Sequence, residues 1–159
     1  KTIHYQNPNM VVGTVSTWDG RILLCRRAIE PRYGFWTLPA GFLENDETTE
    51  QGAERETREE AGAKITALKP FAMIDVPHVN QVHVFYRAEM LSPDLDPGEE
   101  SLEAKLYSAQ DIPWDHIAFR TVYKALKWFL EDQQTDPMFE RSTFHYDAIA
   151  LGSRQRSTA

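Results

Sequence analysis

The chain has 159 residues, a formal net charge of −7 at pH 7 and 42% hydrophobic residues, which suit one globular domain with a single core. The negative charge argues against a protein that coats DNA or an anionic membrane, although a bound divalent cation would still allow a phosphorylated ligand to bind. No stretch approaches the length of a membrane span and no signal-peptide pattern opens the chain, so we expect a cytoplasmic protein with neither membrane nor nucleic acid as partner.

The expected domain spans residues 11–133. Residues 1–10 are interpreted as a remnant leading from a missing upstream segment, because the chain begins with Lys1 rather than methionine. Residues 134–159 are interpreted as a C-terminal tail, partly docked through a small strand at "FHYDAI". The single cysteine, Cys25, lies in an apolar run and is interpreted as a buried structural thiol.

Strand signals dominate the first part of the chain. "MVVGTVS" (10–16) and "RILLCRR" (21–27) are apolar runs separated by an Asp-Gly pair that is typical of a hairpin. "IEPRYGFW" predicts a loop and "TLPA" a short extended piece. A helix is expected to begin between Asp46 and Thr49 and to end at Gly62, because capping residues precede good helix formers and glycine suits the exit.

Further strands and one more helix are expected after residue 63. "KITALKPFAMIDV" should be divided by Pro70, and "QVHVFYRAEML" shows clear alternation. The acidic, proline-bearing loop "SPDLDPGEES" leads to a short strand, "LEAKLYSA". The last helix is predicted at "FRTVYKALKWFLED", where an apolar stripe contains Val122, Leu126, Phe129 and Leu130.

Three glutamates of the first helix fall on one face. Glu56, Glu59 and Glu60 are spaced i, i+3 and i+4, so their Cβ atoms should lie roughly 5–6 Å apart. On a fully exposed helix the repulsion costs only tenths of a kcal/mol per pair, which leaves a solvated acidic face as an alternative. Beside a cleft the same pair would repel by about 3 kcal/mol, and Mg²⁺ or Mn²⁺ would be the natural compensation.

A longer pattern surrounds these glutamates. Seven residues fit the spacing G-x5-E-x7-R-E-U-x-E-E-x-G-U, namely Gly41, Glu47, Arg55, Glu56, Glu59, Glu60 and Gly62. A chance match is on the order of one in 10⁸ per starting position at average residue frequencies. The pattern resembles the Nudix box of the Nudix hydrolase family, although Thr57 and Ala63 meet its two bulky apolar positions weakly, as small core contacts.

The resemblance implies an α/β fold, an α/β/α sandwich with a mixed β-sheet. It also implies a set of Mg²⁺ or Mn²⁺ ligands, which would be Glu56, Glu59 and Glu60 with a backbone carbonyl of Ala40 or Gly41. Arg55 would pair with Glu47 and orient the carboxylates. Gly52, inside the helix, indicates either close approach of a loop or phosphate, or simple tolerance.

The general base and the substrate contacts stay open at this point. Among the acidic-loop residues, Glu103 is the first candidate for a catalytic role and Glu100 the second, with a solvated loop as the alternative; Glu59 or Glu60 could serve instead. The substrate-contact candidates are Phe35 for stacking, Arg26 and Arg27 for the diphosphate, and Glu100. The competing interpretations are a core aromatic and solvated arginines.

Segments outside the box resemble one branch of the family, the FAD and ADP-ribose (dinucleotide) pyrophosphatases, which often carry an N-terminal zinc ribbon. They are "HYQNP", "GFWTLPAGFLE", "PGEESLEAKLY" and "FHY". The resemblance implies Mg²⁺-dependent hydrolysis of the pyrophosphate bond in a nucleoside diphosphate linked to another moiety, giving two monophosphates. The "SQPWPFP" element of NADH pyrophosphatases is missing, which disfavours NADH.

Two alternatives accompany this expectation. A catalytically silent Nudix module that binds a nucleotide as sensor or regulator is disfavoured by the intact box glutamates. RNA 5′-end processing is disfavoured by the acidic charge and the lack of a basic stripe. A homodimer is expected from the family resemblance alone.

Overall fold

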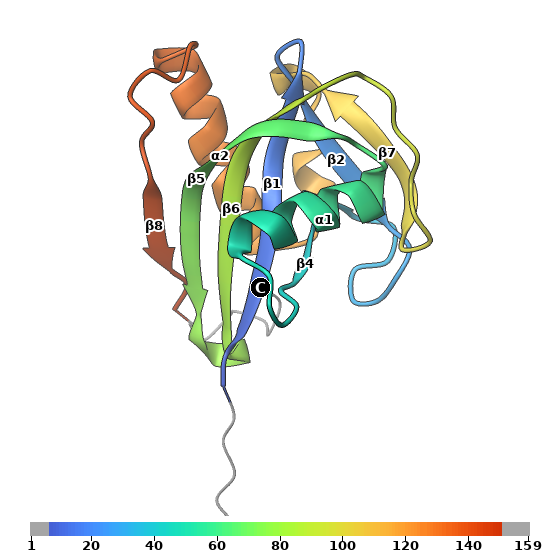
Figure 1. The fold of residues 1–159 in the computed structure, drawn as a ribbon, viewed down its shortest axis with the longest axis vertical. Coiled ribbons are helices and arrows are strands. Elements are labelled where there is room, and N and C mark those ends of the chain that lie inside the picture. The colour runs from blue at the N-terminus through green and yellow to red at the C-terminus, as the bar shows by residue number, and fades with distance from the viewer. Residues whose placement is uncertain (1–6, 151–159) are drawn as a thin grey trace, which may run out of the picture.

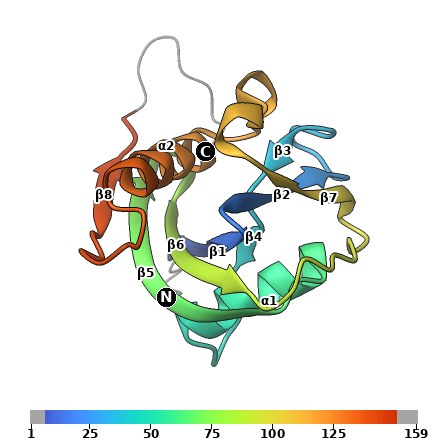
Figure 2. The same ribbon diagram turned by 90° about the horizontal axis from the view of Figure 1, so that it is seen from above.

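A computed structural model describes residues 7–150, which form a curved mixed sheet with one helix on each side (Figures 1 and 2). The helices are α1 (Thr49–Ala61) and α2 (Arg120–Thr135). The strands are β1 (Asn9–Trp18), β2 (Arg21–Arg27), β3 (Trp36–Thr37), β4 (Ala40–Phe42), β5 (Ile65–Val76), β6 (Gln81–Met90), β7 (Ser101–Tyr107) and β8 (His145–Ala148). Short 3₁₀ turns occupy Pro77–Val79, Ala109–Asp111 and Trp114–His116.

The sheet order is β3-β2-β1-β6-β5-β8, with β4 also paired to β1 and β7 to β2. The β1–β6 and β5–β8 pairs are parallel, and the other pairs are antiparallel. This mixed sheet between two helices confirms the expected α/β/α arrangement. No helix in the described range 7–150 is both long enough and apolar enough to cross a membrane.

Alternation along β2 explains how one strand serves two cores. Ile22 and Leu24 are fully buried in the large core that includes the apolar face of α2. Leu23 and Cys25 are buried in a second core with the C-terminal end of α1. Successive side chains of a strand point to opposite faces, so a continuous apolar run is what a sheet covered on both sides requires. Burial raises the pKa of the Cys25 thiol far above its usual value, as a structural role requires.

Local sequence signals set the β1–β2 turn and both ends of α1, as predicted. Asp19 and Gly20 both have positive φ (52° and 76°), which matches the twist of a two-residue hairpin. Thr48 and Gln51 form a reciprocal capping box before α1. Gly62 ends the helix in the left-handed conformation, with φ 66°.

The expected division at Pro70 was wrong. β5 is continuous from Ile65 to Val76, and its pairing with β6 shifts register between Thr66 and Lys69 and again between Pro70 and Ala72. Pro70 itself is in register with Tyr86, and the irregularities on both sides of it accommodate a residue that lacks a backbone N–H, so the strand continues through it.

The C-terminal segment adds the edge strand β8, where a small docked strand was expected; it runs parallel to β5. β1 begins at Asn9, two residues before the expected start of the domain. The remaining parts of the expected terminal segments, 1–6 and 151–159, lie outside the described residues.

Candidate active site

The loop between β4 and α1 lies tightly against the helix. A Cβ atom on Gly41 would lie 2.4 Å from the carboxylate atoms of Glu56, so only glycine fits without displacing that side chain. A Cβ on Gly52 would lie 2.7 Å from Leu43 Cδ1 and 2.9 Å from Glu47 Oε1. Close approach of the loop, one of the two interpretations of Gly52, is therefore the correct one.

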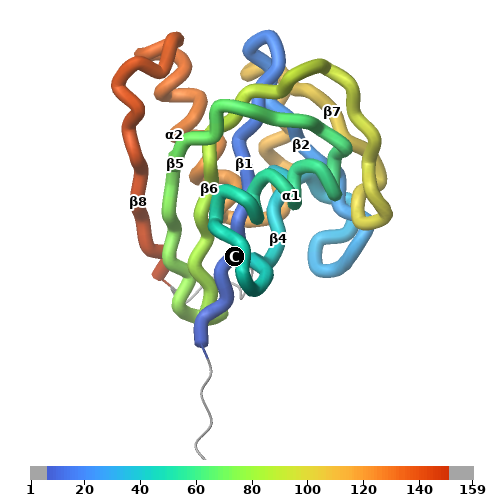
Figure 3. The backbone as a smooth tube through the Cα atoms, in the orientation of Figure 1, coloured from blue at the N-terminus to red at the C-terminus, as the bar shows by residue number. Residues whose placement is uncertain are grey.

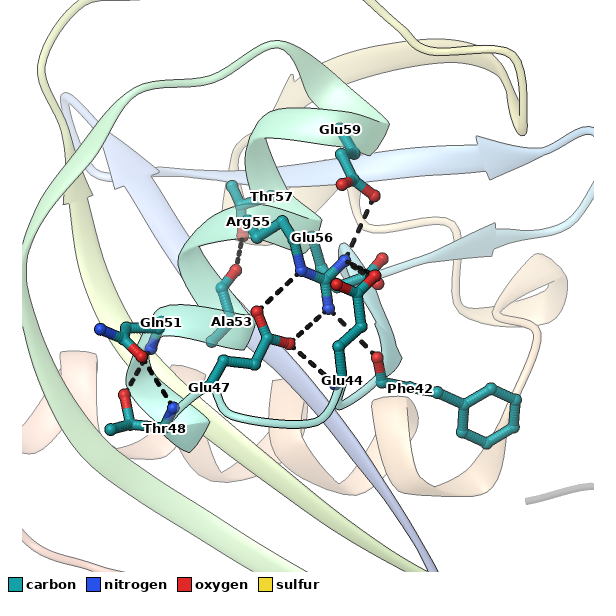
Figure 4. A network of polar contacts seen from close by, with 10 residues as sticks. All are labelled: Phe42, Glu44, Glu47, Thr48, Gln51, Ala53, Arg55, Glu56, Thr57 and Glu59. Atoms are coloured by element: carbon teal, nitrogen blue, oxygen red, sulfur yellow. Dashed lines mark hydrogen bonds and ion pairs between the residues drawn. The ribbon is translucent and has the colours of Figure 1, made fainter.

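Arg55 is the centre of a polar network on this side of α1 (Figure 4). Its Nε and Nη2 donate to the two carboxylate oxygens of Glu47 at 3.0 and 2.7 Å, and Nη2 also donates to the Phe42 carbonyl at 3.1 Å. Its Nη1 donates to Glu56 Oε2 at 2.8 Å and to Glu59 Oε1 at 3.3 Å. The guanidinium thus fixes the loop and two of the three box glutamates together.

Charge is distributed unevenly among these carboxyls. Hydrogen bonds from Arg55 and from the Glu44 backbone lower the pKa of Glu47 to about 2. Burial raises the pKa of Glu56 despite its contact with Arg55. Burial also raises the pKa of Glu60 to about 8, and the charges of Glu56 and nearby Glu100 add to that shift.

Glu60 points away from the arginine. Its Oε1 accepts a hydrogen bond from the Ala40 N–H at 3.1 Å. Within the described residues, no three His, Cys, Asp or Glu side chains are grouped closely enough to hold a metal ion. The reason is visible in the contacts: Glu56 and Glu59 turn to Arg55, and Glu60 turns to Ala40.

The donor set nevertheless fits a hard divalent cation. Carboxylate oxygens are the ligands that Mg²⁺ and Mn²⁺ prefer. Glu56 is buried and Glu60 is partly buried, and removal from water raises the pKa of both carboxyls, with a smaller contribution from the charge of neighbouring glutamates. A divalent cation would offset this cost.

Thr57 occupies a position of α1 where the Nudix box has a bulky apolar residue. Thr57 is fully buried and its hydroxyl donates to the Ala53 carbonyl at 2.8 Å. The same oxygen lies 2.7 Å from Thr14 Oγ1, which lies 2.7 Å from Ser16 Oγ. The hydroxyl is therefore fully paired, so threonine packs there as the small core contact that was predicted.

The glutamates face a cleft of about 810 Å³ that both helices help to line. Glu56, Glu59 and Glu60 line it from α1, and Glu99 and Glu100 from the loop before β7. Figure 3 shows that loop passing beside the C-terminal end of α1, where Gly98 N–H donates to the Glu60 carbonyl at 3.2 Å. An apolar part of the lining comes from Val79, Phe85, Phe119 and Val122. A volume of this size suits a nucleotide-sized ligand.

Two substrate-contact candidates lie in the cleft. Arg27 lines it with its guanidinium 4.8 Å from the centre of the Phe119 ring, and its Nε donates to the Pro31 carbonyl at 2.8 Å. Glu100 lines it from the acidic loop.

Three other candidates, Arg26, Phe35 and Glu103, are not among the residues that line this cleft. Arg26 donates to the Gly34 carbonyl and lies 3.6 Å from Glu103, its partner across the β2–β7 pair. Phe35 packs against His116 and beneath the Arg32 guanidinium. Arg26 and Arg27 differ in position because adjacent residues of a strand point to opposite faces, and Arg27 is on the side of the cleft.

Several lining residues escaped prediction from sequence. Phe42, 55% exposed, lies at the cleft beside Gly41. His83 is 5% exposed, lines the cleft and pairs through Nε2 with Gln81 Oε1 at 2.8 Å. Thr121 also lines it. A strand histidine and a helix threonine carry no distinctive sequence signal, because such residues are usually core.

A family model and several solved structures match this chain. The NUDIX domain model matches residues 8–129. The crystal structure of a NUDIX hydrolase from Nitrosomonas europaea is 46% identical, with a TM-score of 0.87 over 93% of this chain and 82% of that chain. A bifunctional NMN adenylyltransferase/ADP ribose pyrophosphatase from Francisella tularensis, complexed with AMP and a Mn ion, shares the fold at 22% identity, with a TM-score of 0.68 over 80% of this chain and 42% of that chain.

Curated relatives extend the comparison to named activities. An ADP-ribose pyrophosphatase of Methanocaldococcus jannaschii is 29% identical over 119 residues, which are 70% of each chain. The NAD-capped RNA hydrolase NudC of Pseudomonas aeruginosa is 31% identical over 110 residues, 67% of this chain. This match spans only 38% of the NudC chain, so the likeness concerns one part of that protein.

Proposed function

The chain belongs to the NUDIX hydrolase family, and from that premise we propose that it hydrolyses the diphosphate bond of a nucleoside diphosphate linked to a second moiety. The substrates proposed are ADP-ribose and related dinucleotides, FAD included, and the products are two monophosphates. The observation that carries the proposal is the cluster of Glu56, Glu59 and Glu60 on the wall of a nucleotide-sized cleft. The likeness to an ADP-ribose pyrophosphatase supports the substrate class.

In this proposal Glu56, Glu59 and Glu60 hold Mg²⁺ or Mn²⁺. The bound cation would neutralise the phosphoryl oxygens and lower the pKa of the attacking water. Arg55 holds Glu56 and Glu59 relative to the loop, and their carboxylates would rotate from the guanidinium to reach a shared ion. The Ala40 N–H holds one oxygen of Glu60 and leaves the other available to a ligand or a proton.

Arg27 is proposed to contact the diphosphate. Its guanidinium lies over the Phe119 ring and its Nε donates to the Pro31 carbonyl, so the guanidinium is positioned at the cleft with limited freedom. A planar guanidinium can donate two parallel hydrogen bonds to phosphate oxygens. For proton transfer, Glu100 is preferred over Glu103, because Glu100 lines the cleft with the box glutamates.

The test is a substrate panel with Mg²⁺ or Mn²⁺, analysed by product. It should contain ADP-ribose, FAD, NADH, an NAD-capped RNA oligonucleotide and nucleoside triphosphates. We expect AMP and a second monophosphate from ADP-ribose or FAD, and a loss of several orders of magnitude in Glu60→Gln. Cleavage of triphosphates alone would refute the substrate class, and cleavage of the capped RNA would refute the expected absence of a nucleic-acid partner.

Binding of ADP-ribose without hydrolysis would instead support a silent nucleotide-binding module. The cytoplasmic location and the homodimer stay predictions. Fractionation of the source cells and light scattering of the purified chain would test them.

A further inference from the structure

Two buried polar atoms in the cleft wall have no hydrogen-bond partner among the described residues. They are Nδ1 of His83, on β6, and Oγ1 of Thr121, in the first turn of α2. The residues are 5% and 0% exposed, and both line the cleft that holds the glutamates. Leaving such a group unpaired costs on the order of 1–3 kcal/mol, so a native structure that keeps two of them in one wall calls for an explanation.

The two atoms have complementary hydrogen-bonding roles. His83 Nε2 lies 2.8 Å from Gln81 Oε1, an acceptor, so the ring proton belongs on Nε2 and Nδ1 is left to accept. Burial lowers the pKa of His83 to about 4, which keeps the ring neutral. Thr121 can donate its hydroxyl proton. An edge that offers one donor beside one acceptor would satisfy both.

The surroundings favour a flat, uncharged ligand group. Val79, Phe85, Phe119 and Val122 form the apolar lining here, and it would cover the faces of a heterocycle rather than hydrate a phosphate. The N-cap residue of α2, Phe119, makes no capping hydrogen bond through its side chain and the first turn has no acidic residue, so ligand atoms that accept hydrogen bonds are favoured beside Thr121. Neither polar atom is exposed to solvent in this structure, so contact with a base edge would require a local shift of the cleft wall.

We propose that His83 and Thr121 recognise the adenine of the substrate, with the 6-amino group donating to His83 Nδ1 and the Thr121 hydroxyl donating to an adjacent ring nitrogen. This inference rests on the proposed function, which supplies an adenine nucleotide. The glutamates of α1 would then meet the diphosphate while the wall from β6 and α2 reads the base. Because both contacts are removed from water, an analogue that leaves them unpaired should be strongly rejected.

The test measures binding without chemistry. Calorimetry in Mg²⁺ buffer would compare AMP with purine riboside 5′-monophosphate, which lacks only the 6-amino group, and with ribose 5-phosphate. We expect AMP to bind about tenfold more tightly than purine riboside monophosphate. His83→Leu should make the two equal, and ribose 5-phosphate should bind weakly to every variant. Equal binding of AMP and either analogue by the wild-type protein overturns the proposal.

Thr121→Val provides a second, independent readout with a matched control. Valine removes an unpaired hydroxyl at nearly constant shape, so the variant should keep or raise its Tm while AMP binds about tenfold more weakly. Thr14→Val makes the same substitution at an equally buried hydroxyl that is paired with Ser16 and Thr57, so it should lower Tm and leave AMP binding unchanged. If Thr121→Val lowers Tm as Thr14→Val does and binds AMP normally, its hydroxyl is structural and the proposal fails.

Hydrolysis of ADP-ribose separates this inference from the proposed function. Hydrolysis with no effect of His83→Leu or Thr121→Val on AMP binding refutes the adenine subsite alone. The predicted binding changes without hydrolysis of any diphosphate-linked nucleoside refute the proposed function alone.

Discussion

Gly41→Ala should separate catalysis from folding. The added Cβ would lie 2.4 Å from Cδ, Oε1 and Oε2 of Glu56, whereas ordinary contact begins near 3.4 Å, so the carboxylate must move by about 1 Å. The atoms it meets are the far end of a flexible side chain, so the shift is made by Glu56 rather than by the backbone. We therefore expect a small change in Tm. A displacement of about 1 Å in a catalytic group commonly costs on the order of 10²-fold in rate.

The assay combines thermal unfolding, turnover of ADP-ribose and the Mg²⁺ concentration that gives half-maximal activity. Gly41→Ala should lose about two orders of magnitude in kcat/KM and need more Mg²⁺. Gly20→Ala is one control: its hairpin turn has φ 76° and open space around it, so it should lose about 1 kcal/mol of stability and no activity.

A second control introduces a clash with the main chain. A Cβ on Gly98 would lie 2.1 Å from the Glu59 backbone oxygen, which cannot rotate away, so Gly98→Ala should unfold at a clearly lower temperature than Gly41→Ala. A folded Gly41→Ala with normal turnover and normal Mg²⁺ dependence would show that the position of the Glu56 carboxylate does not matter, and the reasoning would be refuted.

Three further predictions concern single groups. Glu100→Gln should reduce turnover at least tenfold and Glu103→Gln by less than twofold, because only Glu100 lines the cleft; the reverse order in steady-state kinetics would contradict this assignment. In chelator, the contribution of Glu60 to stability should fall as pH rises from about 4.5 to about 8, since folded Glu60 retains a proton that the unfolded chain loses. It is measured by urea titration as the difference between wild type and Glu60→Gln; no change of this difference with pH would contradict the assignment, and added Mg²⁺ should raise Tm most at the alkaline end. The contribution of His83 has the opposite slope and should fall as pH drops from about 6.5 to about 4, because the unfolded chain protonates His83 and the folded chain does not; a wild type minus His83→Leu difference that does not change over this range would remove His83 as the cause.

Sequence was most informative where the physics is local. The capping box at Thr48 and Gln51, the left-handed Gly62 and the Asp19-Gly20 turn each depend on a few adjacent residues. Pro70 was misread because a bulge depends on the partner strand, which the sequence of β5 alone does not reveal.

The cleft was harder to predict because it is assembled from distant segments. Arg26 and Arg27 are adjacent residues of the same type, and the sequence does not show which of them is on the face of β2 that lines the cleft with the glutamates. Glu103 was favoured by its place in the chain, yet its register opposite Arg26 takes it out of the cleft. His83 and Thr121 look like ordinary core residues until their unpaired atoms are seen in one wall.

The ion pairs of Arg55 stabilise the acidic helix α1 in the absence of a bound metal ion. The guanidinium pairs with Glu47, Glu56 and Glu59 and offsets part of their mutual repulsion, so α1 can dock on the sheet before any ion is bound. In zinc fingers, by contrast, metal uptake and folding are a single event. If the proposed ion binds here, its uptake would follow folding rather than drive it, so a chelator should remove the ion without unfolding the chain.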